Sequence, residues 1–110
     1  MTHNFSIKID TPSKVIIKGI LKLPSPLAYE EHFKPILSNL EKTSDPEFIV
    51  DITDMAFLNS SGITALARII IKAKQFDKKL TFIANPETAW QKKSLLNLQK
   101  LWSGMEISYA

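Results

Sequence analysis

The sequence predicts an α/β domain, in which a mixed β-sheet of four to five strands packs with three to four helices. Short β-branched segments alternate with amphipathic segments in the second half of the chain, as in parallel strands joined by helical crossovers. Two consecutive strand patterns near the N-terminus supply an antiparallel pair. The length of 110 residues suits one unit, so we expect a single domain over residues 1–110.

Two strands are expected at the start of the chain. Apolar and polar residues alternate from Phe5 to Ile9, which is typical of a half-buried strand. Residues 11–13, Thr-Pro-Ser, form a turn. A second strand follows from Val15 to Leu23, and Gly19 within it indicates a bulge or a close approach of another backbone segment.

The first helix is expected to end at Glu41, with two alternatives for its start. Ser25 is a suitable N-cap before Pro26, and proline is favoured at the first helical position. A start near Glu31 would instead place Pro35 in the first turn, where it is tolerated, so we prefer the later start. The apolar face of this helix consists of Phe33, Ile36, Leu37 and Leu40.

The central segment contains a strand and the most helical stretch of the chain. Phe48 to Ile52 is predicted to be a strand buried on both faces. A connection from Thr53 to Leu58 leads to a helix from Ile63 to Lys78. Its buried stripe is predicted to contain Ile63, Leu66, Ala67, Ile70 and Ala73, widened by Ile69 and Ile71. Lys72, Lys74 and Lys78 are expected to lie away from this stripe.

The C-terminal part continues the alternation of strands and helices. Leu80 to Ala84 is predicted to be a buried strand, and Asn85-Pro86 ends it. A helix follows from Glu87 to about Leu101. Its inward side chains are predicted to be Trp90, Leu95, Leu98 and Leu101. Ser103-Gly104 stops that helix, and Met105 to Tyr109 alternates as a last short strand.

Composition excludes several classes of function. The chain has no cysteine, which rules out disulfides, thiolate metal ligands and cysteine nucleophiles. A net charge of +3 is too small to demand nucleic acid or an acidic membrane as a partner. The longest apolar runs fall far short of a membrane span, and the N-terminus lacks the pattern of a secretory signal. We therefore expect a cytoplasmic protein without membrane insertion.

Catalytic and cofactor sites have little support. The two histidines, His3 and His32, are expected to face solvent, which makes a metal site or a Ser-His-Asp arrangement improbable. No glycine-rich phosphate-binding motif is present, and we expect no cofactor. Asp51 and Asp54 could pair for acid–base chemistry, although such aspartates more often end strands and turns.

The two tryptophans admit two interpretations. Trp90 and Trp102, with Lys92, Lys93 and Lys100, could stack on nucleic acid bases. Their spacing is helical, however, so aromatic residues facing the core and solvated lysines explain the pattern more simply.

The segment Asn59-Ser60-Ser61-Gly62 is the strongest candidate site. Asn and Ser are preferred helix caps, and glycine permits many backbone conformations. One capping residue would be enough to begin a helix, yet three small polar residues lie between the predicted strand and the predicted helix. In parallel α/β sheets this connection lies at the carboxyl edge of the strands, where ligands usually bind. A phosphate on an exposed hydroxyl at a helix N-terminus would be tolerated.

The central segment FIVDITDMAFLNSSGITALARIIIKAK resembles STAS domains, the fold of bacterial anti-sigma factor antagonists. The family pattern is an apolar strand ending in Asp, a short connection with Phe, then Asp-Ser-Ser/Thr-Gly and an apolar helix. Matching residues here are Asp51, Phe57, Ser60, Ser61, Gly62 and Ile63. VIIKGILKL resembles the second strand of the family, with its glycine at position 19, and LTFIANPETAWQKKSLL resembles a later strand and helix more loosely.

The resemblance implies a phosphorylation switch. In the antagonists, an anti-sigma factor kinase of the GHKL type phosphorylates the serine after the acidic residue, and a PP2C-type phosphatase reverses this. By position, the acceptor here is Ser60, with Ser61 as the second choice. Asn59 departs from the family, which has Asp at this position; asparagine keeps the capping ability and lacks the charge.

Two functions are therefore expected from the resemblance. The first is a non-enzymatic regulatory domain that binds a protein partner through residues 59–62 and releases it when Ser60 is phosphorylated. The alternative is a constitutive STAS assembly subunit of a transport or lipid-trafficking complex, which uses the same surface without phosphorylation. An enzyme based on Asp51 and Asp54 is a remote third option.

Overall fold

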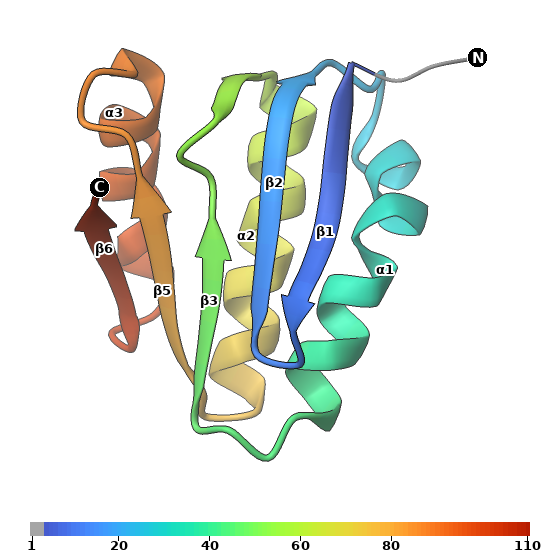
Figure 1. Cartoon of the computed structure of the whole chain (residues 1–110), viewed down its shortest axis with the longest axis vertical. Helices are drawn as coiled ribbons and strands as arrows, with labels where there is room; N and C mark the ends of the chain where they lie inside the picture. The colour runs from blue at the N-terminus through green and yellow to red at the C-terminus, as the bar shows by residue number, and fades with distance from the viewer. Residues whose placement is uncertain (1–3) are drawn as a thin grey trace.

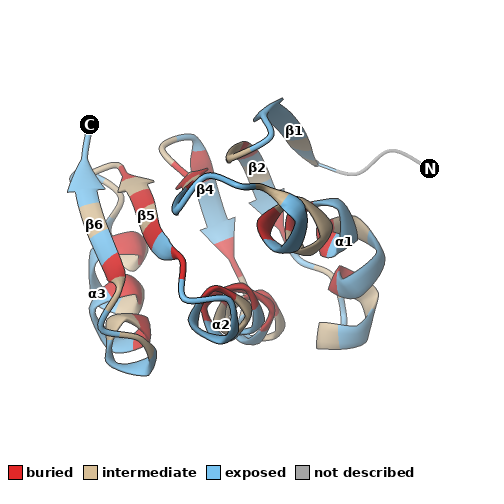
Figure 2. Ribbon diagram, turned by 90° about the horizontal axis from the view of Figure 1, so that it is seen from below, coloured by how far each residue is buried: buried red, intermediate tan, exposed pale blue. Residues whose placement is uncertain are grey.

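The computed structural model describes residues 4–110, which form a two-layer α/β domain. One layer is a six-stranded mixed sheet, and the helices of the described chain all cover the same face of it (Figures 1 and 2). The predicted fold class is confirmed. The sheet has one strand more than the upper number expected.

The elements follow the predicted order with one addition. The strands are β1 (Phe5–Thr11), β2 (Lys14–Leu21), β3 (Glu47–Asp51), β4 (Met55–Leu58), β5 (Lys79–Ala84) and β6 (Met105–Tyr109). The helices are α1 (Pro26–Lys42), α2 (Ser60–Gln75), α3 (Ala89–Leu98) and a short 3₁₀ turn, η1 (Gln99–Leu101). The sheet order is β1-β2-β3-β5-β6, antiparallel between β1 and β2 and parallel between the other neighbours.

Strand β4 was expected to be part of a connection. The first half of β2 pairs with β3, and its second half, from Gly19 to Leu21, pairs in parallel with β4. The chain therefore leaves β3 at Asp51, makes a turn, and forms β4, which pairs with β2 as β3 does. Met55 and Leu58 are buried by this arrangement. The strand is only four residues long and follows a turn, so its sequence carries too short a pattern to reveal it.

Gly19 confirms the expected close approach of two backbones. Its φ of +104° lies in the region that favours glycine, and the register of β2 against β4 shifts directly after it. A Cβ at this position would overlap the carbonyl oxygen of Asn4. The Gly19 amide donates to the Asp54 carbonyl at 2.9 Å, and the Ile20 amide donates to the Asn4 carbonyl at 2.8 Å.

The preferred late start of the first helix is wrong. Helix α1 begins at Pro26, and the Ser25 hydroxyl oxygen accepts a hydrogen bond from the Ala28 amide at 3.2 Å. The earlier turn is retained because it buries Tyr29 on the same face as Phe33. Pro35 consequently lies inside the helix on its exposed side, where the missing N–H leaves one carbonyl without its helical donor.

The expectation that β3 is buried on both faces is also wrong. Phe48 and Val50 point toward the helices and are fully buried, whereas Ile49 and Asp51 alternate with them and are half-buried. Because the described helices cover one face of the sheet, residues on the other face of even a central strand keep contact with water (Figure 2).

Helix α2 starts three residues earlier than expected, and its buried face is rotated. Leu66, Ile69, Ile70 and Ala73 are buried as expected, but the stripe also includes Ala65. Ile63 and Ala67 are half-buried, and Ile71 is 44% exposed rather than inward. Helix α3 shows a similar difference, because Leu95 and Leu98 are buried whereas Trp90 is half-buried and Leu101 lies 39% exposed.

One lysine expected to be outward is buried. Lys78 follows α2, and its Nζ donates to the carbonyls of Thr43 at 2.7 Å and Asp45 at 2.9 Å. These hydrogen bonds hold the α1–β3 connection against the end of α2. Lys74 is exposed, whereas Lys72 is half-buried and pairs with Glu41 at 3.5 Å.

We expect Leu66→Asp to unfold the domain. The Leu66 side chain is fully buried in the core, so an unpaired carboxylate there would be desolvated at a cost of several kcal/mol, on the order of the whole stability of a domain this size. Lys74→Ala, on the exposed side of the same helix, should change stability by less than about 0.5 kcal/mol. Thermal unfolding followed by circular dichroism measures both variants, and equal melting temperatures would contradict the observed orientation of α2.

Candidate functional site

The candidate site lies where β4 passes into α2. Asn59 is the N-cap of α2, with an extended backbone (φ −79°, ψ 175°). Its Oδ1 accepts a hydrogen bond from the Gly62 amide at 3.0 Å, which satisfies one of the free N–H groups of the first turn. The predicted capping segment is thus a helix start, and the cap is Asn59 rather than either serine.

The Asn59 side chain also joins two distant segments. Its Nδ2 donates to the Leu23 carbonyl at 2.8 Å, and its Oδ1 accepts from the Tyr29 hydroxyl at 2.7 Å. The Leu23 amide in turn donates to the Tyr29 oxygen at 3.2 Å. These contacts close a ring of hydrogen bonds among Asn59, Tyr29 and Leu23. The ring ties the start of α2 to the β2–α1 connection and to α1.

Only an amide fits all the contacts of residue 59. A carboxylate in its place could accept from Gly62 and Tyr29, but it could not donate to Leu23 and would set two oxygens against each other. The departure from the STAS pattern at this position therefore has a local structural cause.

Burial raises the pKa of the Tyr29 hydroxyl above its ordinary value, and the hydrogen bond from the Leu23 amide opposes this in part. The hydroxyl is therefore neutral at physiological pH. In that state it can donate to Asn59 while it accepts from Leu23.

The four predicted site residues differ in accessibility. Ser60 is exposed at the first helical position, and Ser61 is half-buried. Within residues 4–110, the Ser60 hydroxyl makes no hydrogen bond. The backbone carbonyl of Ser60 accepts a hydrogen bond from the Thr64 hydroxyl at 3.3 Å. Gly62 is buried, and a Cβ there would overlap Leu58. A partner can therefore reach Ser60 directly, whereas Asn59 and Gly62 act within the fold.

Exposed apolar side chains lie next to this helix start. Phe57 in β4 and Ile20 in β2 are paired across the two strands, and they are 42% and 39% exposed. The Lys22 Nζ lies 5.5 Å from the centre of the Phe57 ring. Phe57 precedes Ser60 by three residues, in the strand that leads directly into α2.

The remaining candidates have separate structural roles. Asp51 accepts from the Thr53 amide at 2.9 Å and the Thr53 hydroxyl at 2.6 Å, which ends β3 in a turn. Asp54 pairs with Lys18 at 3.9 Å on the surface. Each carboxylate thus has its own partner, and no contact joins the two within the described residues. Residues 4–110 also contain no cluster of three or more His, Asp and Glu side chains placed to hold a metal ion.

The tryptophans and histidines are accounted for as far as the structure describes them. The Trp90 indole N–H donates to the Ala56 carbonyl and the Trp102 indole N–H to the Lys78 carbonyl, both at 3.0 Å. Both rings are half-buried against the core, in agreement with the simpler interpretation. His32 is half-buried rather than fully solvated, and its ring meets the Phe5 ring edge-on at 5.1 Å. His3 lies outside the described residues.

Sequence reasoning missed two residues that support the site. Tyr29 is one, and Gln91 is the other. Gln91 is fully buried, and its Nε2 donates to the carbonyls of Ile52 at 2.7 Å and Met55 at 2.9 Å, which holds the turn before β4. Gln91 stands at helical spacing from Leu95 and Leu98, so the periodicity of α3 could have predicted its burial.

Comparison with models of known protein families finds no match for this chain, and no curated protein shows significant similarity to it in sequence. In residues 4–110, no helix is both long enough and apolar enough to cross a lipid bilayer.

We expect Asn59→Asp, which places the residue typical of STAS domains at this position, to destabilise the protein. Loss of the donor to the Leu23 carbonyl should cost about 1–3 kcal/mol, and a negative charge at the helix start should return about 0.3–1 kcal/mol. Urea denaturation at neutral pH should therefore show a net loss of about 1–2 kcal/mol. An Asp variant at least as stable as the parent protein would show that the amide contact is dispensable.

Alkaline pH should weaken the protein through Tyr29. Because burial raises the pKa of this hydroxyl in the folded state, its proton stabilises folding fully below about pH 10 and progressively less above that. Above about pH 10, the free energy of unfolding of the parent protein should fall more steeply with pH than that of Tyr29→Phe, and below about pH 10 the two slopes should agree. Parallel curves for the two proteins would contradict a role for this hydroxyl.

Proposed function

We propose that this protein is a non-enzymatic regulatory domain of the STAS type, whose protein partner binds around Ser60 and leaves when Ser60 is phosphorylated. One observation carries this proposal. The Ser60 hydroxyl is exposed at the start of α2, and the capping role that would otherwise explain it belongs to Asn59.

The electrostatics of the helix start favour such a switch. The first turn of α2, residues 60–63, carries no acidic side chain, so a phosphate there meets the positive end of the helix dipole without a competing charge. Phosphorylation adds about −1.5 to −2 charges at neutral pH. In the free domain these charges are solvated. Against a docked partner they must be desolvated, which costs more than the dipole returns.

The resemblance to anti-sigma factor antagonists names the partner classes. A GHKL-type kinase or anti-sigma factor would bind the unmodified form, and a PP2C-type phosphatase would restore it, all within the cytoplasm. The exposed side chains of Phe57 in β4 and Ile20 in the neighbouring β2 supply a contact that a docked partner would cover. Asn59 is compatible with this function, because its identity follows from the contact with Leu23.

A constitutive assembly subunit, as in STAS domains of transport or lipid-trafficking complexes, is the second candidate. The same apolar surface favours it, because Phe57 and Ile20 can hold a partner permanently without any modification. The two candidates differ in one respect. The first requires that a negative charge at position 60 abolish binding.

We expect Ser60→Asp to fold normally and lose its partner. The introduced carboxylate should raise or preserve stability, by up to about 1 kcal/mol, while affinity falls at least about tenfold. Ser60→Ala should fold and bind, and Ser44→Asp, which adds the same charge at an exposed loop position, should bind as the parent protein does. Partners are captured with the unmodified protein from native lysate, identified by mass spectrometry, and titrated against each variant.

Two results would count against the switch. If Ser60→Asp binds as tightly as the parent protein, the hydroxyl has no regulatory role and the assembly subunit is the better description. If mass spectrometry of the protein from its native source finds phosphate at Ser61 and none at Ser60, the acceptor assignment is wrong.

A further inference from the structure

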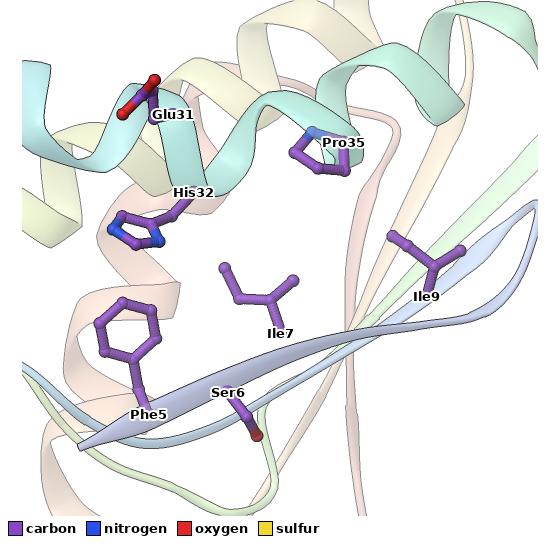
Figure 3. A pocket seen from close by; sticks show the side chains of 7 residues that line it. All are labelled: Phe5, Ser6, Ile7, Ile9, Glu31, His32 and Pro35. Atoms are coloured by element: carbon purple, nitrogen blue, oxygen red, sulfur yellow. The ribbon is translucent and has the colours of Figure 1, made fainter. Parts of the chain in front are cut away.

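A groove runs between β1 and α1, away from the site around Ser60. Its volume is about 370 Å³, and Figure 3 shows side chains of both elements turned toward it. From β1 it is lined by Phe5, Ile7 and Ile9, and from α1 by Glu31, His32 and Pro35, with Ser6 at its margin. Its walls are therefore mainly apolar on the strand side and mixed on the helix side.

Strand β1 presents an open edge to this groove. Among the described strands, β1 has a neighbour on one side alone, which is β2. The Ile20 amide donates to the Asn4 carbonyl, so in this antiparallel ladder the even-numbered residues of β1 bond to β2. The N–H and C=O groups of Ile7 and Ile9 consequently point away from β2, toward the open edge. A second strand could pair with them there.

Helix α1 lacks one regular hydrogen bond on the opposite wall. Pro35 has no N–H, so the Glu31 carbonyl, four residues earlier, lacks its helical donor. Both residues line the groove. The strand side of this space therefore presents backbone groups that do not bond to β2, and the helix side lacks one helical hydrogen bond.

Glu31 supplies the one carboxylate among the residues that line the groove. The Glu31 carboxylate is exposed and makes no ion pair within residues 4–110, whereas the neighbouring Glu30 pairs with Arg68 at 3.0 Å. A second groove on α1 is lined in part by Glu30, Glu31 and Lys34, so Glu31 borders both grooves. An occupant with one positive charge near Glu31 would complement this wall.

We infer that the groove binds an extended peptide segment that adds as a strand to β1. Its inward side chains are apolar opposite Ile7 and Ile9, and basic near Glu31, at the end of the groove where His32 meets Phe5. The stretch from Phe5 to Ile9 spans about 17 Å, so about five residues of the peptide make contact. A strand suits the site better than a small molecule, because only a strand pairs with the row of backbone groups at the edge.

Synthetic peptides test this inference in the intact protein. The probes are the blocked heptapeptide TKTVTVT and its reversed sequence TVTVTKT, which place the basic residue correctly for either strand direction. In control peptides Glu replaces Lys. Titrations are followed by NMR, and amide hydrogen exchange at Ile7 and Ile9 is measured at saturating peptide.

One of the two Lys peptides should slow exchange at Ile7 and Ile9 by at least about fivefold, and its Glu counterpart should bind more weakly. Glu31→Lys should weaken the Lys peptide by about fivefold or more and favour the Glu peptide. Glu87→Lys makes the same charge change at an exposed position before α3 and should leave binding unchanged.

Three results would overturn the inference. Exchange at Ile7 and Ile9 that no peptide slows would exclude strand addition. Shifts confined to groove side chains, with unchanged exchange, would indicate a small-molecule pocket instead. Equal binding of the Lys peptide to Glu31→Lys and the parent protein would remove the proposed charge selection. The groove and Ser60 lie on different elements, so these results leave the proposed switch untouched.

Discussion

The amide of Asn59 holds together three segments that are far apart in the sequence. It caps α2 through Gly62, donates to the chain between β2 and α1 at Leu23, and accepts from Tyr29 on α1. Helices α1 and α2 pack against each other on the sheet, so this one side chain sets where α2 begins relative to both layers. Because Asn59 caps the helix, the Ser60 hydroxyl is not needed as a cap and stays exposed.

Coverage of the sheet on one face explains most other features. Alternate residues of the strands form a core with the helices, while the opposite face carries half-buried residues such as Ile49 and charged ones such as Lys18. The edges of such a sheet need separate protection. At β6, the Gln99 side chain donates to the Met105 carbonyl at 3.1 Å and so occupies part of that edge. At β1, α1 stands across a groove instead, which leaves Ile7 and Ile9 available for pairing.

The two proposed binding surfaces depend on different interactions. Around Ser60 we propose that charge added to an exposed hydroxyl at the start of α2 controls binding. In the β1 groove, backbone hydrogen bonds and one carboxylate, Glu31, select the ligand. Modification at Ser60 and strand addition at β1 can therefore act independently within one small domain.

Local patterns in the sequence determined the fold class, both antiparallel N-terminal strands, β5, β6, the glycine at position 19 and the helix start at residues 59–62. Each of these depends on a few neighbouring residues, through alternation, turn chemistry or capping. Tertiary contacts alone decided the strand β4, the early start of α1 and the burial of Lys78. A four-residue strand forms because β2 extends past β3, and a polar side chain is buried only where distant carbonyls accept its protons. The sequence likewise marked Ser60 as a candidate, but its free hydroxyl depends on where Tyr29 and Leu23 meet Asn59 in space.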